Sequence, residues 1–182
     1  MLTKNDIEKY FIAEKQESLL FLIIGILAIA VAVTVLFFYK SQFFKGAVIP
    51  FIIIGLLQVV VGYTIYNKSD ADRMRIVYAY DMSPTDIKTF EIPRMQQVNT
   101  NFIIYRWVEI VLLVAGLLVV FYCQFYTCKL PKNSDTNYFI YGLAIALLIQ
   151  ASIMLTADFF AERRAKKYTQ LLESFITINK IP

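Results

Sequence analysis

The segment 102–126, FIIYRWVEIVLLVAGLLVVFYCQFY, decides the fold of this chain. A helix of this length, at about 1.5 Å per residue, exceeds the roughly 30 Å hydrocarbon core of a bilayer. Its first two turns nevertheless carry Arg106, Trp107 and Glu109, where a membrane helix normally has apolar residues. Arg106 and Glu109 are three residues apart and therefore share one helix face. The segment predicts a membrane helix with a built-in charge pair.

The composition indicates an integral membrane protein. The 182 residues are 58% hydrophobic and 15% aromatic, and the mean hydropathy is +0.58, which is too apolar for an ordinary soluble domain. The formal net charge of +4 is explained by membrane topology, because no stripe of Lys and Arg is separable from the membrane flanks. We therefore expect the lipid bilayer as a partner and no nucleic acid.

Three further apolar runs complete the predicted architecture. Leu19–Tyr39 has no charged residue, and its Ala28 and Ala32 form a small-xxx-small pair that permits close helix approach. Gly46–Tyr66 tolerates Pro50 in its first turn, where a missing N–H costs little. The sequence predicts an all-α, polytopic membrane protein, a single four-helix domain over 1–182 with spans at about 19–39, 46–66, 102–126 and 137–160.

The polar segments are predicted to extend these helices beyond the membrane. Residues 5–18 form an amphipathic lead-in whose apolar stripe includes Tyr10 and Glu14. Residues 67–101 are a connector with a helical extension, and residues 161–182 form a C-terminal helix. Two prolines interrupt the connector, so the third helix is predicted to begin at Pro93.

The distribution of Lys and Arg predicts the orientation. The segments 1–18, 67–101 and 161–182 hold three, five and five of the eighteen basic residues, whereas the turn 40–45 and the turn-rich loop 127–136 hold two each. Because basic residues favour the cytoplasmic side, both termini and the connector are expected in the cytoplasm. The expected location is a cell membrane, most simply a bacterial inner membrane.

The two halves of the chain show a weak internal repeat. A shift of 83 places Phe38 and Tyr39 on Phe121 and Tyr122, and a shift of 92 places Gln58 on Gln150. This pattern predicts two tandem helical hairpins with the same orientation. Apolar helices match each other easily, so duplication and chance similarity both stay open.

Arg106, Glu109 and Asp158 are the charged residues predicted to lie within the spans. Ionisable residues are costly in lipid and often mark functional sites. In one interpretation Arg106 snorkels to the cytoplasmic interface and Glu109 pairs with it. In the other, the three residues form a cluster that binds a cation, passes a proton or pins the helices together.

Gln58 and Gln150 are predicted to lie near the middle of the membrane at matching depth. A buried amide in lipid needs a hydrogen-bond partner. Structural interhelical hydrogen bonding is the first interpretation, and a polar lining for a small conduit is the second.

Catalysis, metals and cofactors are not expected. The chain has no histidine, no phosphate-binding glycine loop and no catalytic Ser or Cys constellation. Cys123 and Cys128 are expected to be two free thiols at the outer end of the third membrane helix, near the membrane surface.

These observations favour a small membrane-embedded interaction protein, of the accessory-subunit or toxin-immunity type, that binds a protein partner in or at the membrane. Self-association stays open. The alternative is a small ion or proton channel or transporter that uses the intramembrane charges. Unbroken spans disfavour transport, because substrate sites of transporters usually interrupt a helix.

Overall fold

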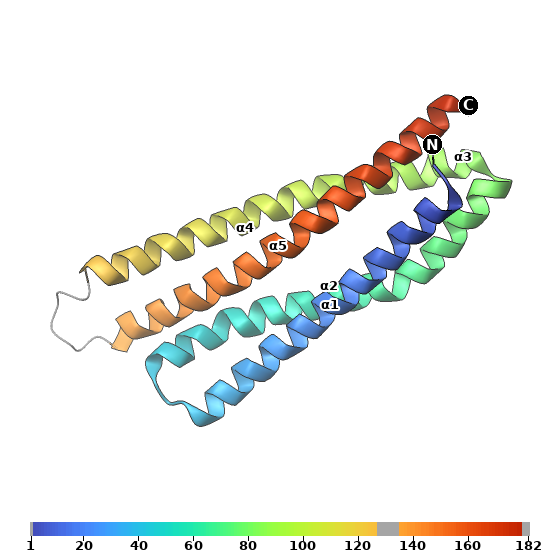
Figure 1. The fold of residues 1–182 in the computed structure, drawn as a ribbon. Coiled ribbons are helices and arrows are strands. Elements are labelled where there is room, and N and C mark those ends of the chain that lie inside the picture. Colours follow the sequence, from blue (N-terminus) through green and yellow to red (C-terminus); the bar gives the residue numbers. More distant parts are fainter. Residues whose placement is uncertain (1, 127–134, 180–182) are drawn as a thin grey trace. The chain divides into compact units, whose positions relative to one another are not determined.

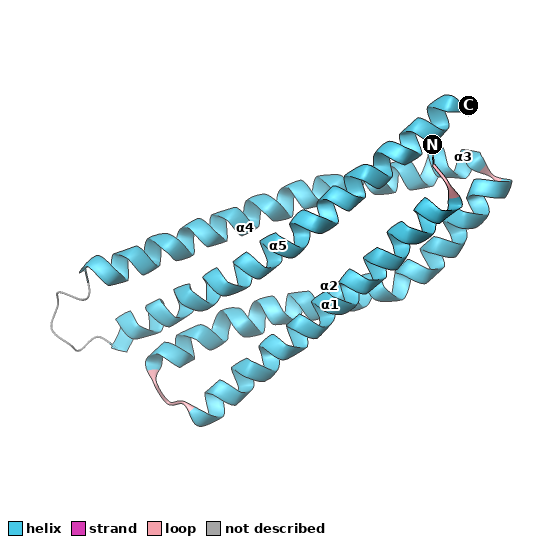
Figure 2. Ribbon diagram, in the orientation of Figure 1, coloured by secondary structure: helices cyan, strands magenta, loops and turns pink. Residues whose placement is uncertain are grey.

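The computed structural model describes residues 2–126 and 135–179, and within these ranges the chain is helical with no strand (Figures 1 and 2). Four of its helices are long, and a short helix and a π-helical turn precede the third long one. In chain order the elements are α1 (Lys4–Phe38), α2 (Gln42–Met82), α3 (Pro84–Asp86), η1 (Ile87–Glu91), α4 (Ile92–Tyr126) and α5 (Asp135–Ile178).

Four helical segments are long and apolar enough to cross a membrane: Lys4–Phe38, Gln42–Met82, Pro84–Phe125 and Asp135–Ile178. The predicted all-α class with four helices able to span a membrane is therefore confirmed. This result is compatible with a multi-pass membrane protein. The hairpin arrangement, the identity of the membrane and the side on which the termini lie stay predictions.

The predicted lead-in and the first span form one continuous helix, α1. Thr3 and Asp6 cap its first turn reciprocally, since the Asp6 carboxylate accepts from the Thr3 N–H at 3.0 Å and the Asp6 N–H donates to Thr3 Oγ1 at 3.2 Å. This arrangement resembles a capping box and satisfies donors that the helix leaves unpaired. The polar start of the chain and the apolar run thus belong to one helix.

The helical continuations predicted over 67–80 and 161–176 are confirmed, because α2 runs to Met82 and α5 to Ile178. Their 41 and 44 residues correspond to more than about 60 Å of helix, roughly twice the hydrocarbon core. Both helices are thus too long to lie entirely within the apolar layer of a bilayer.

The third long helix, α4, begins at Ile92 with Pro93 in its first turn, so the predicted start at Pro93 is confirmed to within one residue, but the predicted interruption of the helix at Ile92-Pro93 is wrong. The interruption lies at Ser83, whose extended backbone (φ −147°, ψ 68°) separates α2 from α3, and Pro84 occupies the first turn of α3. From there the chain stays helical through η1 into α4, with Pro93 as the second residue of α4. A π turn inserts one extra residue into the helix. The π turn lies just before Pro93, which has no backbone N–H to donate, and the helix continues past this proline.

The predicted external loop over 127–136 lies mostly outside the described residues, and so do Cys128 and the two loop lysines. Its last two residues instead belong to the first turn of α5, which begins at Asp135. Cys123, at the end of α4, is buried.

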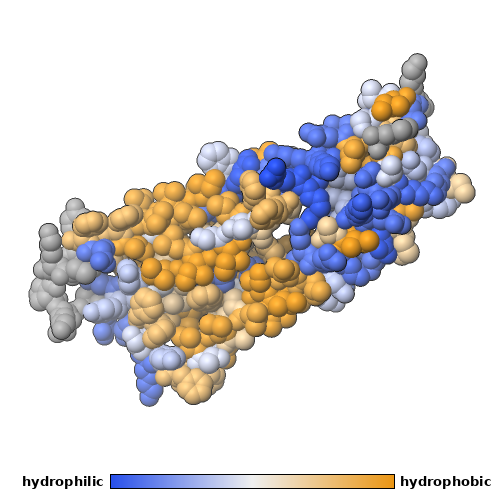
Figure 3. All heavy atoms as spheres, viewed as in Figure 1, coloured by the Kyte–Doolittle hydropathy of each residue, from blue (hydrophilic) through white to orange (hydrophobic). Residues whose placement is uncertain are grey.

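The contact pattern divides the chain into two compact units, each containing a segment of every long helix. Unit 1 comprises Met1–Leu20, Val61–Tyr105 and Ala157–Pro182, and unit 2 comprises Phe21–Val60 and Arg106–Thr156. In Figure 3 the visible surface of unit 1 is mainly hydrophilic and that of unit 2 mainly hydrophobic. The two surfaces therefore suit water and lipid respectively.

Unit 1 has a core of large apolar side chains. Its buried members are Leu2, Ile7, Tyr10, Phe11, Ile76, Ala79, Ile87, Met95, Ala165, Tyr168, Leu172 and Phe175. Ion pairs at the helix junctions surround this core. Lys15 on α1 pairs with Asp70 on α2, and Glu17 on α1 pairs with Arg164 on α5.

Unit 2 has an interior built mainly from small residues. A Cβ on Gly46 would overlap the Phe139 carbonyl, and one on Gly142 would overlap the Phe43 carbonyl, so α2 and α5 touch backbone to backbone. A Cβ on Gly25 would lie 2.7 Å from the Gly55 carbonyl oxygen of α2. The close approach predicted at Ala28 and Ala32 is confirmed for Ala28, whose Cβ would lie 3.4 Å from a Cβ on Gly55, and both alanines are buried. It is the arrangement expected where packing, not exclusion of water, holds helices together.

Candidate functional site

Unit 2 buries three polar side chains inside its small-residue interior. Gln58 on α2 and Gln150 on α5 are each 1% exposed, and Glu109 on α4 is 2% exposed. Among the residues that the structure describes, neither amide has a hydrogen-bond partner for its Oε1 or its Nε2. Most buried polar groups in proteins are hydrogen-bonded, so two such amides are an unusual feature.

The helix contacts place these three residues at similar depth in unit 2. The α2 and α5 helices begin at the same end of the unit (Figure 1) and touch at Gly46 and Gly142. Gln58 follows its glycine by twelve residues and Gln150 follows its glycine by eight, a difference of about 6 Å along the axis.

The α4 helix brings Glu109 to the same level. Gly116 on α4 lies against Leu148 on α5, and the two helices run in opposite directions (Figure 1). Glu109 is two turns from Gly116 and so lies level with the α5 segment that follows Gln150. We call Gln58, Glu109 and Gln150 the polar layer of unit 2.

The predicted charge cluster is divided between the units. Arg106 lies in unit 2 with Glu109, three residues away on the same helix face, and is half-buried. Asp158 is also half-buried but belongs to unit 1. A cluster of all three residues therefore stays a prediction, and the polar layer is the grouping that one unit contains.

Unit 1 contains a second polar grouping, centred on Glu14. The Tyr10 hydroxyl donates to Glu14 Oε1 at 3.0 Å, and the Ser69 hydroxyl donates to Glu14 Oε2 at 3.2 Å. The Tyr10 ring stacks on that of Tyr168 with centroids 4.1 Å apart. Because these residues come from α1, α2 and α5, the grouping connects three helices.

The fourth helix joins this grouping through Arg94. Its guanidinium donates to both carboxylate oxygens of Glu91, at 2.9 and 2.7 Å, and lies over the Phe11 ring of α1 at 5.3 Å. Glu91 is fully buried at the end of the π turn. The bidentate pair compensates a carboxylate that would be very costly alone in the core.

The environment shifts the titration of these groups. Burial raises the pKa of the Glu14 carboxyl above its ordinary value, and Arg94 only partly opposes this effect. Burial also raises the pKa of the Tyr10 and Tyr168 hydroxyls, and the nearby carboxylates act in the same direction. For Arg94, burial alone would lower the pKa, but hydrogen bonds and the charge of Glu91 raise it.

This grouping was missed as a site by the sequence analysis, although two signals pointed to it. Tyr10 and Glu14 lie on the apolar stripe of the lead-in, where a carboxylate needs partners. Glu91 and Arg94 have the three-residue spacing of a helical ion pair. Because a helix break was expected at Ile92-Pro93, between Glu91 and Arg94, the two residues were not expected to share one helix.

No cluster of three or more His, Cys, Asp or Glu side chains suited to a metal ion occurs within residues 2–126 and 135–179. In the unit 1 grouping Glu91 is paired with Arg94, and Glu14 accepts hydrogen bonds from the hydroxyls of Tyr10 and Ser69. In the polar layer, by contrast, the two amides have no hydrogen-bond partner among the described residues. No family model, curated protein or solved structure matches this chain.

Proposed function

We propose that the protein is a membrane-embedded interaction protein, in which unit 2 lies in the bilayer and unit 1 docks a protein partner in the cytoplasm. In this proposal the protein catalyses no reaction. The distribution of Lys and Arg supports the cytoplasmic side for unit 1. The hydrophobic surface of unit 2 in Figure 3 supports its place in lipid.

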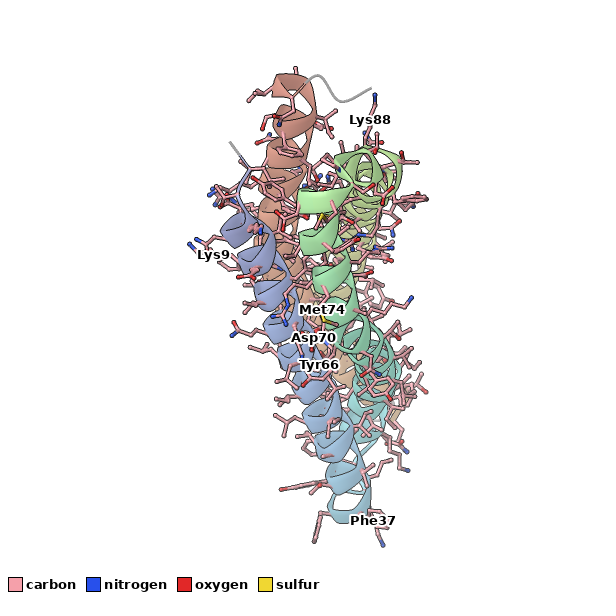
Figure 4. All side chains as sticks on the ribbon, turned by 90° about the vertical axis from the view of Figure 1, so that its right-hand side faces the viewer. Lys9, Phe37, Tyr66, Asp70, Met74 and Lys88 are labelled. Atoms are coloured by element: carbon pink, nitrogen blue, oxygen red, sulfur yellow. The ribbon has the colours of Figure 1, made fainter. Side chains whose placement is uncertain are left out.

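The observation that carries the docking role is an exposed apolar stripe on α2. Met74, Tyr78 and Met82 are 64%, 66% and 71% exposed and follow one another at four-residue steps. Figure 4 shows Met74 beyond Asp70 and Tyr66 along α2. This docking stripe lies in unit 1, the unit with the hydrophilic surface, where exposed large apolar residues are unfavourable unless something covers them.

The chemistry of the stripe indicates an apolar partner surface. Methionine adapts to varied partners, and tyrosine is enriched in the centres of interfaces. The charges beside the stripe are already paired, Arg75 with Asp72 at 2.9 Å and Asp81 with Lys4 at 2.6 Å. A stripe along one helix is complementary to the apolar face of a second amphipathic helix. We therefore infer a helical partner segment of the kind that an accessory subunit or an immunity protein recognises.

A small ion or proton channel is the second candidate, favoured by the burial of Glu109 among the amides of unit 2. Against it, the spans are continuous helices. Pro50 lies inside α2, in its third turn and not in the first turn as predicted, yet the helix continues through it. Transporter sites usually interrupt a helix, so binding ranks above transport.

Site-specific photo-cross-linking in cells tests the docking proposal. A photoreactive phenylalanine analogue replaces Tyr78 in one strain and Ile178 in another. Ile178 is a matched control, because it is 59% exposed and lies in unit 1 on α5. We expect a discrete adduct heavier than the 21.0 kDa chain from position 78 and none from position 178.

A second variant makes the test specific. Met74→Asp places a charge within the stripe and should remove the adduct at position 78 without changing the amount of protein in the membrane. An adduct of twice the chain mass identifies a second copy as the occupant and contradicts a separate partner protein. Equal adducts from both positions, or an adduct that Met74→Asp leaves unchanged, also contradict the proposal.

A further inference from the structure

On α5, the exposed large side chains change from aromatic to basic within residues 159–167 of unit 1. Phe159 and Phe160, just beyond the start of this unit at Ala157, are 51% and 59% exposed. The next exposed residues along the helix are all basic. We define the aromatic-basic patch as Phe159, Phe160, Arg163, Lys166 and Lys167.

Ring contacts and helical spacing hold the patch together. The Phe159 and Phe160 rings meet edge to face with centroids 5.6 Å apart, and the Arg163 guanidinium lies over the Phe159 ring at 5.5 Å. The N–H donors of a guanidinium lie in its own plane, so a contact through its face leaves them able to bind a ligand. Lys167 follows Arg163 by four residues and is therefore its neighbour on the helix surface.

Two of the three cations in the patch have no ion pair. Lys166 is paired with the buried Glu162 at 2.6 Å. Neither Arg163 nor Lys167 makes a salt bridge with any residue that the structure describes. Asp158 is half-buried and lies roughly 140° around the helix from Arg163. The patch therefore presents two positive charges to its surroundings.

The direction of α5 turns these basic side chains toward the bilayer. Side chains of a helix tilt toward its N-terminus, and α5 begins at Asp135 in unit 2. With the two rings at the hydrocarbon boundary, Arg163 lies about 5 Å and Lys167 about 11 Å further along the helix. The headgroup layer is roughly 5–8 Å thick. Arg163 thus lies within this layer, and the long stem of Lys167 brings its ammonium group back to it.

We propose that the aromatic-basic patch binds the headgroup of an anionic phospholipid. Arg163 and Lys167 bind its phosphate, and the rings of Phe159 and Phe160 lie against the upper part of its acyl chains. A guanidinium matches two phosphate oxygens through paired N–H donors. Basic residues beside a membrane attract anionic lipids, and aromatic rings are enriched at the membrane interface. A zwitterionic lipid has its own ammonium group beside the phosphate, so it gains less from two cations.

This inference shares with the proposed function only the placement of unit 2 in the bilayer. The docking stripe lies on α2 and contributes no residue to the patch. Lipid binding is measured in detergent, where neither a bilayer nor a protein partner is needed. A missing headgroup preference would therefore overturn this inference and leave the docking role intact.

Native mass spectrometry of the purified full chain in a nonionic detergent tests the proposal. Dioleoyl phosphatidylglycerol and dioleoyl phosphatidylcholine are titrated separately, so that only the headgroup differs. We expect the wild type to bind its first phosphatidylglycerol with a Kd roughly 25-fold below that for phosphatidylcholine, since each of the two cations contributes roughly fivefold. The double variant Arg163→Gln, Lys167→Gln should lose this preference.

The double variant Lys9→Gln, Lys88→Gln is the charge-matched control, because it removes two exposed lysines of unit 1 from α1 and η1. Both elements begin in unit 1, so their side chains tilt away from the part of the chain in unit 2. The control should keep the preference of the wild type. Equal Kd values for the two lipids in the wild type, or an equal loss of preference in both double variants, would overturn the proposal.

Competition with inorganic phosphate separates a lipid site from a site for free phosphate. An excess of inorganic phosphate should leave the bound phosphatidylglycerol in place, because the aromatic rings also hold its acyl chains. Displacement of the lipid by inorganic phosphate would identify a phosphate-ion site and contradict the proposal.

Discussion

Two glutamates of unit 1, the buried Glu91 and the half-buried Glu14, are stabilised in different ways. Glu91 is fully buried and is held by two charge-assisted hydrogen bonds from Arg94. Glu14 has hydroxyl donors from Tyr10 and Ser69 but no hydrogen-bonded base. Hydroxyls compensate the burial of a carboxylate less than a guanidinium does. Burial therefore disfavours the ionised form of Glu14 and raises the pKa of its carboxyl.

The raised pKa of Glu14 predicts a specific pH dependence. Because burial raises this pKa above the ordinary value of 4.5, the folded protein retains the Glu14 proton at a pH where the unfolded chain has lost it. The free energy of unfolding then falls as pH rises from 4.5 to the folded pKa and is constant above it. In Glu14→Gln this component is absent. As pH rises through this interval, the free energy of unfolding of Glu14→Gln should therefore increase relative to that of the wild type.

Denaturant unfolding at a series of pH values measures this difference. Glu8→Gln is the control, because it changes an exposed carboxylate on the same helix. It should give a difference that does not change with pH over the same interval. A Glu14→Gln profile parallel to that of the wild type would show that the carboxyl is not desolvated as described.

At the scale of helices, the glycines of unit 2 set how closely neighbours approach. Gly46 and Gly142 each meet a backbone carbonyl of the opposite helix, which cannot move without the whole helix moving. A Cβ added at Gly116 would instead lie 2.9 Å from the Cγ of Leu148, a side chain that has other rotamers. The two kinds of contact should respond differently to an added methyl group.

Gly46→Ala and Gly142→Ala should each destabilise the protein by about 1–3 kcal/mol, because an added methyl group overpacks a backbone contact. Gly116→Ala should change stability little, since the gain of about 0.5–1 kcal/mol in helix propensity offsets a small side-chain shift. Unfolding in mixed micelles with increasing SDS measures all three variants. A Gly116→Ala loss as large as that of Gly46→Ala would contradict the assigned contacts.

The sequence was sufficient to predict the spans and their helical continuations. Long uncharged runs such as 19–39 have one stable form in lipid, so length and hydropathy determine them. The helical continuity of the chain through Ile92-Pro93 was not predictable in this way. A proline is compatible with a helix when a π turn precedes it, and here the π turn Ile87–Glu91 comes directly before α4.

The candidate sites were only partly accessible from sequence. Gln58, Gln150 and Glu109 stood out because polar residues are rare in apolar runs. Their assembly into one layer depends on which small residues touch, as at Gly46 and Gly142, and a single sequence does not specify those pairs. The sequence pattern placed Glu14 on the apolar stripe of the lead-in. Its partner Ser69 on α2, and Tyr168 on α5, which stacks on Tyr10, are far away in the chain and could not be paired with it from sequence.

At the scale of the whole molecule, every long helix belongs to both units and is expected to pass from lipid into water. Unit 2 exposes large apolar side chains such as Leu118 and Val111, whereas the junctions of unit 1 are braced by ion pairs. Exposed apolar residues are stable in a bilayer, and exposed ion pairs are stable in water. The central claim is therefore that equally exposed residues of the two units meet different solvents.

Cysteine accessibility tests this claim most directly. Leu118→Cys and Met74→Cys are compared in a Cys123→Ser, Cys128→Ser background in nanodiscs, where both membrane faces are open. The two positions are matched, because Leu118 in unit 2 and Met74 in unit 1 are both 64% exposed. With a water-soluble maleimide, the Met74 position should react at least about tenfold faster, since the hydrocarbon core contains no water. Equal reaction rates at the two positions would contradict the account.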